Sequence, residues 1–332
     1  MDARWLSTPE DVWVGRVDGD GPEHARWHQV VASIVPQPAP TGDVPGDVAR
    51  DVALIGFASD EGVRRNHGRP GAAAAPDAIR RALAPLAVHR PLCAGGPALR
   101  DAGTIRVVGQ DLEGAQSALA EAVAWALDRH RLVVVLGGGH ETAYGSFLGR
   151  RRCPRTRDAH TGVINLDAHF DLRDAPLASS GTPFLQMARD DAEHGRAFDY
   201  TVLGIAASAN TRALFERADA LDATYLLDRD CQPHRLAHVL EVVDAAIADA
   251  DVLHLSIDMD VLPAAVAPGV SAPAGYGVPM ETALAVCEHI AASGKLAVVD
   301  VVEVAPPYDL DGRTARAAAR LVSSLVEALP AP

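Results

Sequence analysis

The amino-acid sequence predicts a three-layer α-β-α sandwich with a mainly parallel central sheet. Short apolar runs rich in β-branched residues alternate with longer segments of helical periodicity, which is typical of β-α units. The chain has 332 residues, of which 48% are hydrophobic and 22% charged, a composition typical of globular proteins. Neither a repeat of fixed period nor a shift in composition marks a second domain.

The elements follow one another in a simple order. Residues 1–50 show little periodicity, so we interpret them as an N-terminal extension or lid ahead of a single catalytic domain over residues 51–332. The predicted strands are 52–57, 132–136, 162–166, 201–205, 252–257 and 297–302. Apolar residues recur at helical spacing over 112–127 and 236–247, and these faces are expected to cover the sheet. The charge-free stretch 261–280 contains four prolines, which exclude a membrane-spanning helix and indicate a loop.

Composition argues against several classes of partner. The formal net charge is −14, which disfavours nucleic acid or an anionic membrane surface. The cysteines at 93, 153, 231 and 287 form no Cys-x-x-Cys pair, and the first residues show no signal-peptide pattern. We therefore expect a reduced, cytoplasmic protein whose main partner is neither nucleic acid nor a membrane.

Three of the predicted strands end in clusters of metal-ligating residue types. Strand 132–136 is followed by three glycines, His140 and Glu141; strand 162–166 is followed by Asp167, His169 and Asp171; and strand 252–257 is followed by Asp258 and Asp260. Ligands in open α/β sheets bind outside the carboxyl ends of the strands, so these clusters are expected to meet. An extended run would point alternate side chains, such as Asp167 and His169, toward one face.

The types of residue in these clusters indicate the kind of site. Four aspartates and two histidines without a thiolate suit a hard or borderline ion such as Mn²⁺ better than a structural zinc. Six ligands are too many for one catalytic ion that keeps open positions, so two ions that share aspartates are favoured. Each cluster alone could be a tight turn or a solvated loop, but their common place at strand ends favours a metal site.

With these clusters identified, the chain resembles the ureohydrolase family, which includes arginase, agmatinase and formimidoylglutamase. The resemblance extends upstream over Gly56 to Arg80 and downstream over Asp300 to Pro306, with every motif in family order from about residue 50 to the C-terminus. The segment from Asp167 to Arg173, followed by Ser179 to Phe184, looks most like the formimidoylglutamase branch. Arginase-like members carry a proton-shuttling histidine at the position of Phe184, which weakens an arginase or agmatinase interpretation.

The resemblance implies an arginase-like fold and roles for individual residues. One Mn²⁺ would be held by His140, Asp167, Asp171 and Asp258, and the other by Asp167, His169, Asp258 and Asp260. A hydroxide between the ions would be the nucleophile, and Glu303 would be the catalytic carboxylate that accepts the amidinium N–H groups. Arg173 stands where arginases carry an asparagine that contacts the substrate carboxylate, and an arginine suits a more acidic substrate. Asn66, Arg69 and Ser180 are further candidates for substrate binding.

The leading hypothesis is a binuclear manganese hydrolase that cleaves N-formimidoyl-L-glutamate to L-glutamate and formamide in histidine degradation, with a homo-oligomer expected. A hydrolase of another guanidino or amidino acid, agmatinase-like or arginase-like, stays open as the alternative. A non-catalytic metal-binding relative is disfavoured because all six ligand positions and Glu303 are present. A dinucleotide-binding oxidoreductase is disfavoured because no Gly-x-Gly-x-x-Gly motif opens a helix after the first predicted strand.

Overall fold

The computed structural model of the chain describes residues 4–34, 51–89 and 99–331. Within them, ten strands form one sheet in the order β1-β4-β3-β5-β10-β9-β6-β7-β8, and β2 also pairs with β4. The strands are β1 (Trp5–Leu6), β2 (Val31–Ser33), β3 (Val52–Ala58), β4 (Leu99–Arg106), β5 (Leu132–Leu136), β6 (Thr161–Leu166), β7 (Asp199–Ile205), β8 (Thr224–Leu227), β9 (Val252–Asp258) and β10 (Leu296–Val302). Every pair is parallel except β1 with β4, which confirms the mainly parallel sheet.

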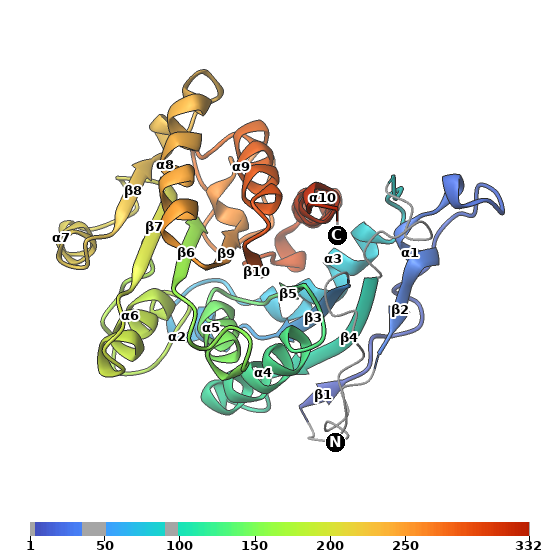
Figure 1. Ribbon diagram of the computed structural model, residues 1–332, viewed down its shortest axis with the longest axis horizontal. Coiled ribbons are helices and arrows are strands. Elements are labelled where there is room, and N and C mark those ends of the chain that lie inside the picture. The colour runs from blue at the N-terminus through green and yellow to red at the C-terminus, as the bar shows by residue number, and fades with distance from the viewer. Residues whose placement is uncertain (1–3, 35–50, 90–98, 332) are drawn as a thin grey trace.

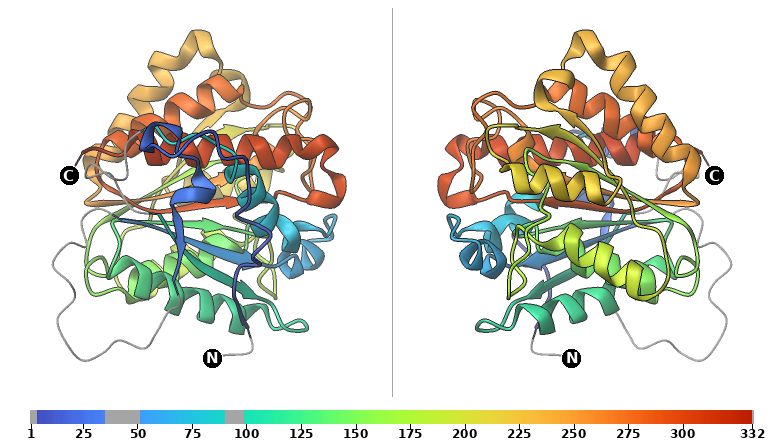
Figure 2. Two further views of the ribbon diagram at one scale, coloured as in Figure 1. Left: turned by 90° about the vertical axis from the view of Figure 1, so that its right-hand side faces the viewer. Right: turned by 90° about the vertical axis from the view of Figure 1, so that its left-hand side faces the viewer.

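Helices cover both faces of this sheet. They are α1 (Trp27–Val30), α2 (Glu61–Arg65), α3 (Ala75–Leu83), α4 (Leu112–Leu127), α5 (Thr142–Arg152), α6 (Pro183–Glu193), α7 (Arg212–Ala220), α8 (Leu236–Asp249), α9 (Met280–Ala292) and α10 (Arg313–Ala328). Helices α4, α5 and α6 lie along one face, and α3, α8, α9 and α10 lie along the other (Figures 1 and 2). The predicted three-layer α-β-α sandwich is therefore confirmed.

Strand β3 shows why a sequence of this kind forms three layers. Its residues from Val52 to Phe57 are all buried, because the sheet is covered on both sides. Val52 and Leu54 pack into the core shared with α3 and α10, whereas Ala53 and Ile55 pack into the core shared with α4. The two-residue period of a strand thus sends alternate apolar side chains into opposite layers.

The six strands predicted from the sequence are all present, but the sheet contains four more. Strand β4 escaped the prediction because it carries Arg100, Asp101 and Thr104 among its apolar residues. It also contains Gly103, where an added Cβ would lie 2.5 Å from the carbonyl oxygen of Leu6 in β1. The missed strands β1, β2 and β8 have only two to four residues each, too few to show a period.

The N-terminal segment extends the sheet at its β4 edge. In residues 4–34, β1 pairs antiparallel and β2 parallel with β4, and Trp27 is almost fully buried in the core. The remaining residues of the predicted extension, 1–3 and 35–50, lie outside the described part of the chain, as does Cys93. A lid function for this segment stays a prediction.

The strand order brings distant segments together at one edge of the sheet. Strands β5, β10, β9 and β6 are direct neighbours, so their carboxyl ends lie side by side. A short 3-10 turn over Met259–Val261 follows β9, and the predicted loop then extends to Pro279, after which α9 begins at Met280. Among the helices of the described residues, none is long and apolar enough to cross a membrane.

Candidate metal centre

The six predicted ligands converge at the carboxyl ends of β5, β6 and β9, and we call them the ligand cluster. The His140 group consists of His140, Asp167, Asp171 and Asp258. The Nδ1 atom of His140 lies 3.1 Å from Asp167 Oδ2, 3.0 Å from Asp171 Oδ2 and 3.1 Å from Asp258 Oδ2. One imidazole nitrogen and three carboxylate oxygens therefore face a common point.

The His169 group consists of Asp167, His169 and Asp260. The Nδ1 atom of His169 lies 3.1 Å from Asp260 Oδ2 and 3.5 Å from Asp167 Oδ1. Asp167 thus turns one oxygen toward each group, which is the geometry of a bridging carboxylate. Asp258 belongs only to the His140 group, so its predicted bridging role stays a prediction.

Two similar turns create this convergence. Asp167 Oδ1 accepts the backbone N–H of His169 at 2.7 Å, and Asp258 Oδ1 accepts that of Asp260 at 2.8 Å. These bonds from a side chain to the backbone two residues further on are Asx turns. The expected extended runs were wrong, because β6 ends at Leu166 and Asp260 lies in a 3-10 turn. The two-residue spacing instead supplies a turn in which both side chains stay on the same side.

The glycines before His140 allow two loops to approach closely. An added Cβ on Gly138 would lie 1.8 Å from the carbonyl oxygen of Ser59, in the loop after β3. The backbone N–H of Gly139 donates to that same oxygen at 3.0 Å. A larger residue at Gly138 would therefore push the loop after β3 away from the loop that carries His140.

The charge balance of the ligand cluster fits bound cations. His140 Nδ1 is buried and has no hydrogen-bond partner among the described residues, although three carboxylate oxygens lie next to it. Burial raises the pKa of Asp258 well above its ordinary value, and the negative charges of Asp260 and Asp167 raise it further. Four aspartates with only two imidazoles hold an excess of negative charge that a divalent ion would neutralise.

Glu303 is fixed against the loop that carries His140. It follows β10, has a positive φ of 66° and is 5% exposed. Its Oε1 accepts the backbone N–H of His140 at 2.9 Å, and its own N–H donates to Gly138 O at 2.8 Å. Burial raises the pKa of Glu303 well above its ordinary value, and the nearby Glu141 adds to this effect.

Glu141 joins the same loop to α2. Its Oε1 accepts the Ser59 hydroxyl at 2.5 Å and the Gly62 N–H at 3.0 Å. The structure shows that it tethers α2, whose C-terminal end is followed by Asn66, to the candidate metal centre.

Phe184 occupies the position where a histidine is expected in arginase-like members. It is fully buried in the first turn of α6, and its ring meets the ring of His140 edge-on at 5.1 Å between centroids. This position therefore supplies packing behind a candidate ligand and no titratable group.

A cleft of about 740 Å³ lies between α2 and the loop after Asp171, and none of the six candidate ligands lines it. Asn66 Nδ2 donates to Ser180 Oγ at 3.2 Å, and an added Cβ on Gly181 would come within 2.7 Å of Arg173 Cδ. Among the arginines that line the cleft, Arg64 and Arg65 pair with Glu61, and Arg217 donates to a backbone carbonyl. The guanidinium of Arg173 has no polar partner among the described residues, so it is available to an anion.

Arg69 makes contacts that the sequence did not predict. Its side chain donates to the carbonyls of Ser271 at 3.0 Å and Val270 at 2.6 Å, and its guanidinium lies 4.4 Å from the ring centroid of Tyr308. It therefore joins the loops that follow β9 and β10. Its role as a substrate contact stays a prediction.

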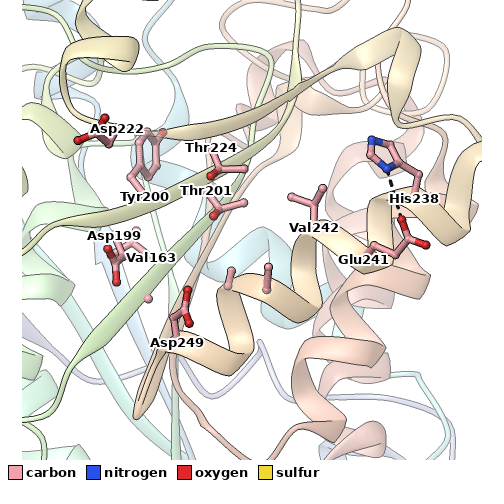
Figure 3. Close-up of a pocket in the computed structure, with 13 residues that line it drawn as sticks. Val163, Asp199, Tyr200, Thr201, Asp222, Thr224, His238, Glu241, Val242 and Asp249 are labelled. Carbon is pink, nitrogen blue, oxygen red and sulfur yellow. Dashed lines mark ion pairs between the residues drawn. The ribbon is translucent and has the colours of Figure 1, made fainter.

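A second hollow of about 320 Å³ lies between α8 and the strands β6, β7 and β8 (Figure 3). It is found near the start of β7, at Asp199 and Thr201, and therefore at the opposite end of the strands from the ligand cluster. None of the six candidate ligands lines it. Its carboxylates are consequently no part of the candidate metal centre.

Comparison with known sequences gives a consistent result. A sequence model of the Arginase family matches residues 50–327. A formimidoylglutamase from Nocardia farcinica is 53% identical over 322 residues, covering 96% of this chain and 96% of the relative. A formimidoylglutamase from Rhodococcus jostii is 51% identical, covering 97% of this chain and 96% of the relative.

Solved structures share the fold. The crystal structure of formimidoylglutamase from Bacillus subtilis has a TM-score of 0.77 at 22% identity, covering 95% of this chain and 96% of the other. The structure of Trypanosoma cruzi formiminoglutamase with Mn²⁺ has a TM-score of 0.73 at 26% identity, covering 85% of this chain and 95% of the other. The arrangement of sheet and helices is therefore common to these proteins and this chain.

Proposed function

The chain belongs to the arginase family, and from this membership we propose that it hydrolyses N-formimidoyl-L-glutamate to L-glutamate and formamide, a step of histidine degradation. The observation that carries the proposal is the identity of about half of all residues, over nearly the full length, with two formimidoylglutamases. The ligand cluster supplies the matching chemistry, because it is suited to divalent ions.

In this proposal two Mn²⁺ ions are the cofactor. His140, Asp167, Asp171 and Asp258 would hold one ion, and Asp167, His169, Asp258 and Asp260 the other. When bound, such ions lower the pKa of water, so that a nucleophile is available near neutral pH. The backbone N–H groups of His169 and Asp260 keep the carboxylates of Asp167 and Asp258 in place before any ion binds.

The protein's own residues orient the amidine. Glu303 has one oxygen committed to the His140 N–H, and its other oxygen remains to accept an N–H group of the substrate. Water adds to the formimidoyl carbon, the bond from that carbon to the glutamate nitrogen breaks, and this nitrogen takes up a proton as it leaves. Because Glu303 is anchored through both its side chain and its backbone N–H, its position does not depend on substrate.

The carboxylates of the substrate would be bound in the cleft between α2 and the loop after Asp171. We assign this role first to Arg173, whose guanidinium is unpaired and can form two parallel hydrogen bonds to a carboxylate. Asn66 and Ser180, which bond to each other, offer additional polar groups next to Arg173. Arg69 would contribute indirectly by holding the loops that follow β9 and β10.

Two further expectations accompany this function. Three cysteines of the described residues are free and buried, which suits a cytoplasmic protein. A homo-oligomer is expected, and light scattering after gel filtration would measure its size.

A substrate panel tests the proposal. The purified protein, loaded with Mn²⁺, is given formimidoylglutamate, arginine, agmatine and guanidino acids, and the products are identified by mass spectrometry. We expect glutamate and formamide from the first compound, with about two Mn²⁺ per chain by elemental analysis. Urea from arginine or agmatine, with formimidoylglutamate unreacted, would overturn the proposal in favour of another member of the family.

A further inference from the structure

Asn165 in β6 is fully buried next to the candidate ligand Asp167. Its Nδ2 lies 3.0 Å from Asp167 Oδ2 and 3.0 Å from the hydroxyl of Tyr200. An ionised carboxylate only accepts hydrogen bonds, so the NH₂ end of the amide must face Asp167. The Tyr200 hydroxyl donates to the carbonyl of Phe170 at 3.0 Å, which leaves it free to accept from Asn165.

Asn165 contacts only one of the two oxygens of Asp167. That oxygen, Oδ2, is the one that lies 3.1 Å from His140 Nδ1. The other oxygen, Oδ1, faces His169 and has its own donor, the His169 N–H. Each oxygen of this carboxylate is therefore held by a separate hydrogen bond, one for each group of ligands.

The amide of Asn165 is costly to the fold. Its Oδ1 is buried without a partner among the described residues, and an unsatisfied buried carbonyl destabilises a protein. An apolar side chain of similar volume would avoid this cost. A purely structural role therefore explains an asparagine here poorly, whereas a required donor to Asp167 explains it well.

Tyr200 fixes the second hydrogen of the amide and packs behind the same group. Its ring stacks on Phe184 at 4.6 Å between centroids, and Phe184 in turn meets the edge of His140. Asn165, Tyr200 and Phe184 thus form one layer behind two ligands of the His140 group. Within the described residues, the side chains of Asn165, Tyr200 and Phe184 form no hydrogen bond with His169 or Asp260.

We propose that Asn165, oriented by Tyr200, is a positioning residue that sets the affinity of the His140 group for its ion and leaves that of the His169 group unchanged. The inference rests on the proposed binuclear centre. It predicts an asymmetry between the two ions that the six ligands alone do not explain.

Manganese titration of Asn165→Leu tests the proposal. Loss of a hydrogen bond to a ligating group typically weakens metal binding by roughly 10- to 100-fold, and we expect a shift of this size for one ion only. Calorimetry, together with the electron paramagnetic resonance signal of free Mn²⁺, measures both dissociation constants. Asn165→Ala is the second variant and is expected to shift the same ion if leucine disturbs folding.

Two backgrounds identify which ion is affected. In His169→Ala, which keeps the His140 group, adding Asn165→Leu should weaken the remaining ion by the same factor. In His140→Ala, which keeps the His169 group, adding Asn165→Leu should leave the affinity for the remaining ion unchanged. Equal weakening in both backgrounds, or in neither, would overturn the proposal.

Thr201→Val is the matched control. Thr201 is a buried polar residue on the neighbouring strand β7, and it lines the hollow at α8, away from the ligand cluster (Figure 3). We expect this variant to bind both ions like the wild type. Tyr200→Phe, which keeps the ring and removes the hydroxyl, should shift the same ion as Asn165→Leu by a smaller factor.

Two further readouts separate positioning from structural damage. The metal-free Asn165→Leu protein should melt no lower than the wild type, and its activity should be lost at limiting Mn²⁺ but restored at saturating Mn²⁺. Activity that excess metal does not restore would contradict the proposal. If the wild type bound no Mn²⁺, the proposed centre would fail; if it bound two and the variant bound them equally well, only the positioning role would fail.

Discussion

Two buried polar clusters of this protein differ in how their charge is balanced. At the β4 edge, Arg80 is fully buried and donates to Asp101 Oδ1 at 2.8 Å. Asp101 also accepts from the Gly103 N–H, from Thr8 Oγ1 at 2.8 Å and from Trp13 Nε1 at 2.7 Å. We call this set the edge cluster. Among the fully buried side chains of this set one cation meets one carboxylate, which has four donors, and the partly exposed Asp77 also lies 3.4 Å from Arg80 Nη1.

The ligand cluster, by contrast, has no such balance. It contains four carboxylates and two histidines, and His140 Nδ1 and Asp260 Oδ1 are buried without hydrogen-bond partners among the described residues. A buried charge that is left uncompensated is costly, so this arrangement is stable only with a bound partner of opposite charge. Arg80 Nε is likewise buried without a hydrogen-bond partner among the described residues, so the two clusters differ in charge and not in hydrogen bonding. The comparison teaches that a buried cation matched by a buried carboxylate marks a structural cluster, and a surplus of one charge marks a functional one.

The sharpest test of the comparison is Asp167→Asn. Asp167 faces both ligand groups, so we expect both ions to bind weakly and kcat/KM to fall by about 10⁴-fold, or roughly 5 kcal/mol. The metal-free variant should be no less stable than the wild type, because one negative charge is removed from a repulsive cluster. Elemental analysis, kinetics and thermal melting measure these effects. A variant that keeps both ions at full occupancy would contradict the bridging geometry.

A substitution in the edge cluster should lower the stability of the protein but not its metal binding. Asp101→Ala removes the buried carboxylate that pairs with Arg80 and leaves only the partly exposed Asp77 at 3.4 Å, so we expect a loss of about 3–5 kcal/mol in the free energy of unfolding. The folded fraction should still bind Mn²⁺ with the wild-type stoichiometry. Urea unfolding and metal analysis on one preparation check both points. Loss of metal without loss of stability would show that the two clusters are not independent.

Arg173→Ala tests the cleft arginine for which the described residues offer no polar partner. A charge-assisted hydrogen bond contributes about 1.5–3 kcal/mol, so kcat/KM on formimidoylglutamate should fall by about one to two orders of magnitude. Metal content should not change, and a neutral amidine without carboxylates should lose far less. Arg64→Ala is the control, because Arg64 lines the same cleft but is paired with Glu61. Equal losses on both substrates would return Arg173 to a structural role.

The smallest expected effect concerns His130, a buried residue next to the C-terminal end of α4. Burial lowers its pKa below the ordinary histidine value, and its Nδ1 lies 2.9 Å from the Ala126 carbonyl. As the pH falls, this histidine is therefore protonated in the unfolded chain before it is protonated in the folded one. The free energy of unfolding consequently decreases below about pH 6.5, by at most ~1.4 kcal/mol per pH unit. His130→Gln should lose less stability over this range in urea unfolding at several pH values. An identical pH profile would contradict this explanation.

Much of the site could be predicted from the sequence because the signals are local. The ligand residues follow recognisable strands, and the Asp-x-His and Asp-x-Asp spacings belong to turns that close over two residues. The physical reason given for that spacing, an extended run, was nevertheless wrong. Strand β4 was missed for a related reason: its polar residues serve distant partners, and so they interrupt the apolar pattern of a buried strand.

The sequence by itself determined the layered fold, the places of the six candidate ligands at strand ends and the loop after β9, because periodicity and residue type are properties of short segments. Only the tertiary structure decided which polar atoms meet. The sheet order places β10 between β5 and β9, which brings Glu303 to the His140 backbone. Likewise, only the structure shows that Arg69 is bonded to the loop after β9. A hydrogen bond needs its two atoms within about 3 Å, and residues far apart in the chain meet at that distance only once the whole sheet has formed.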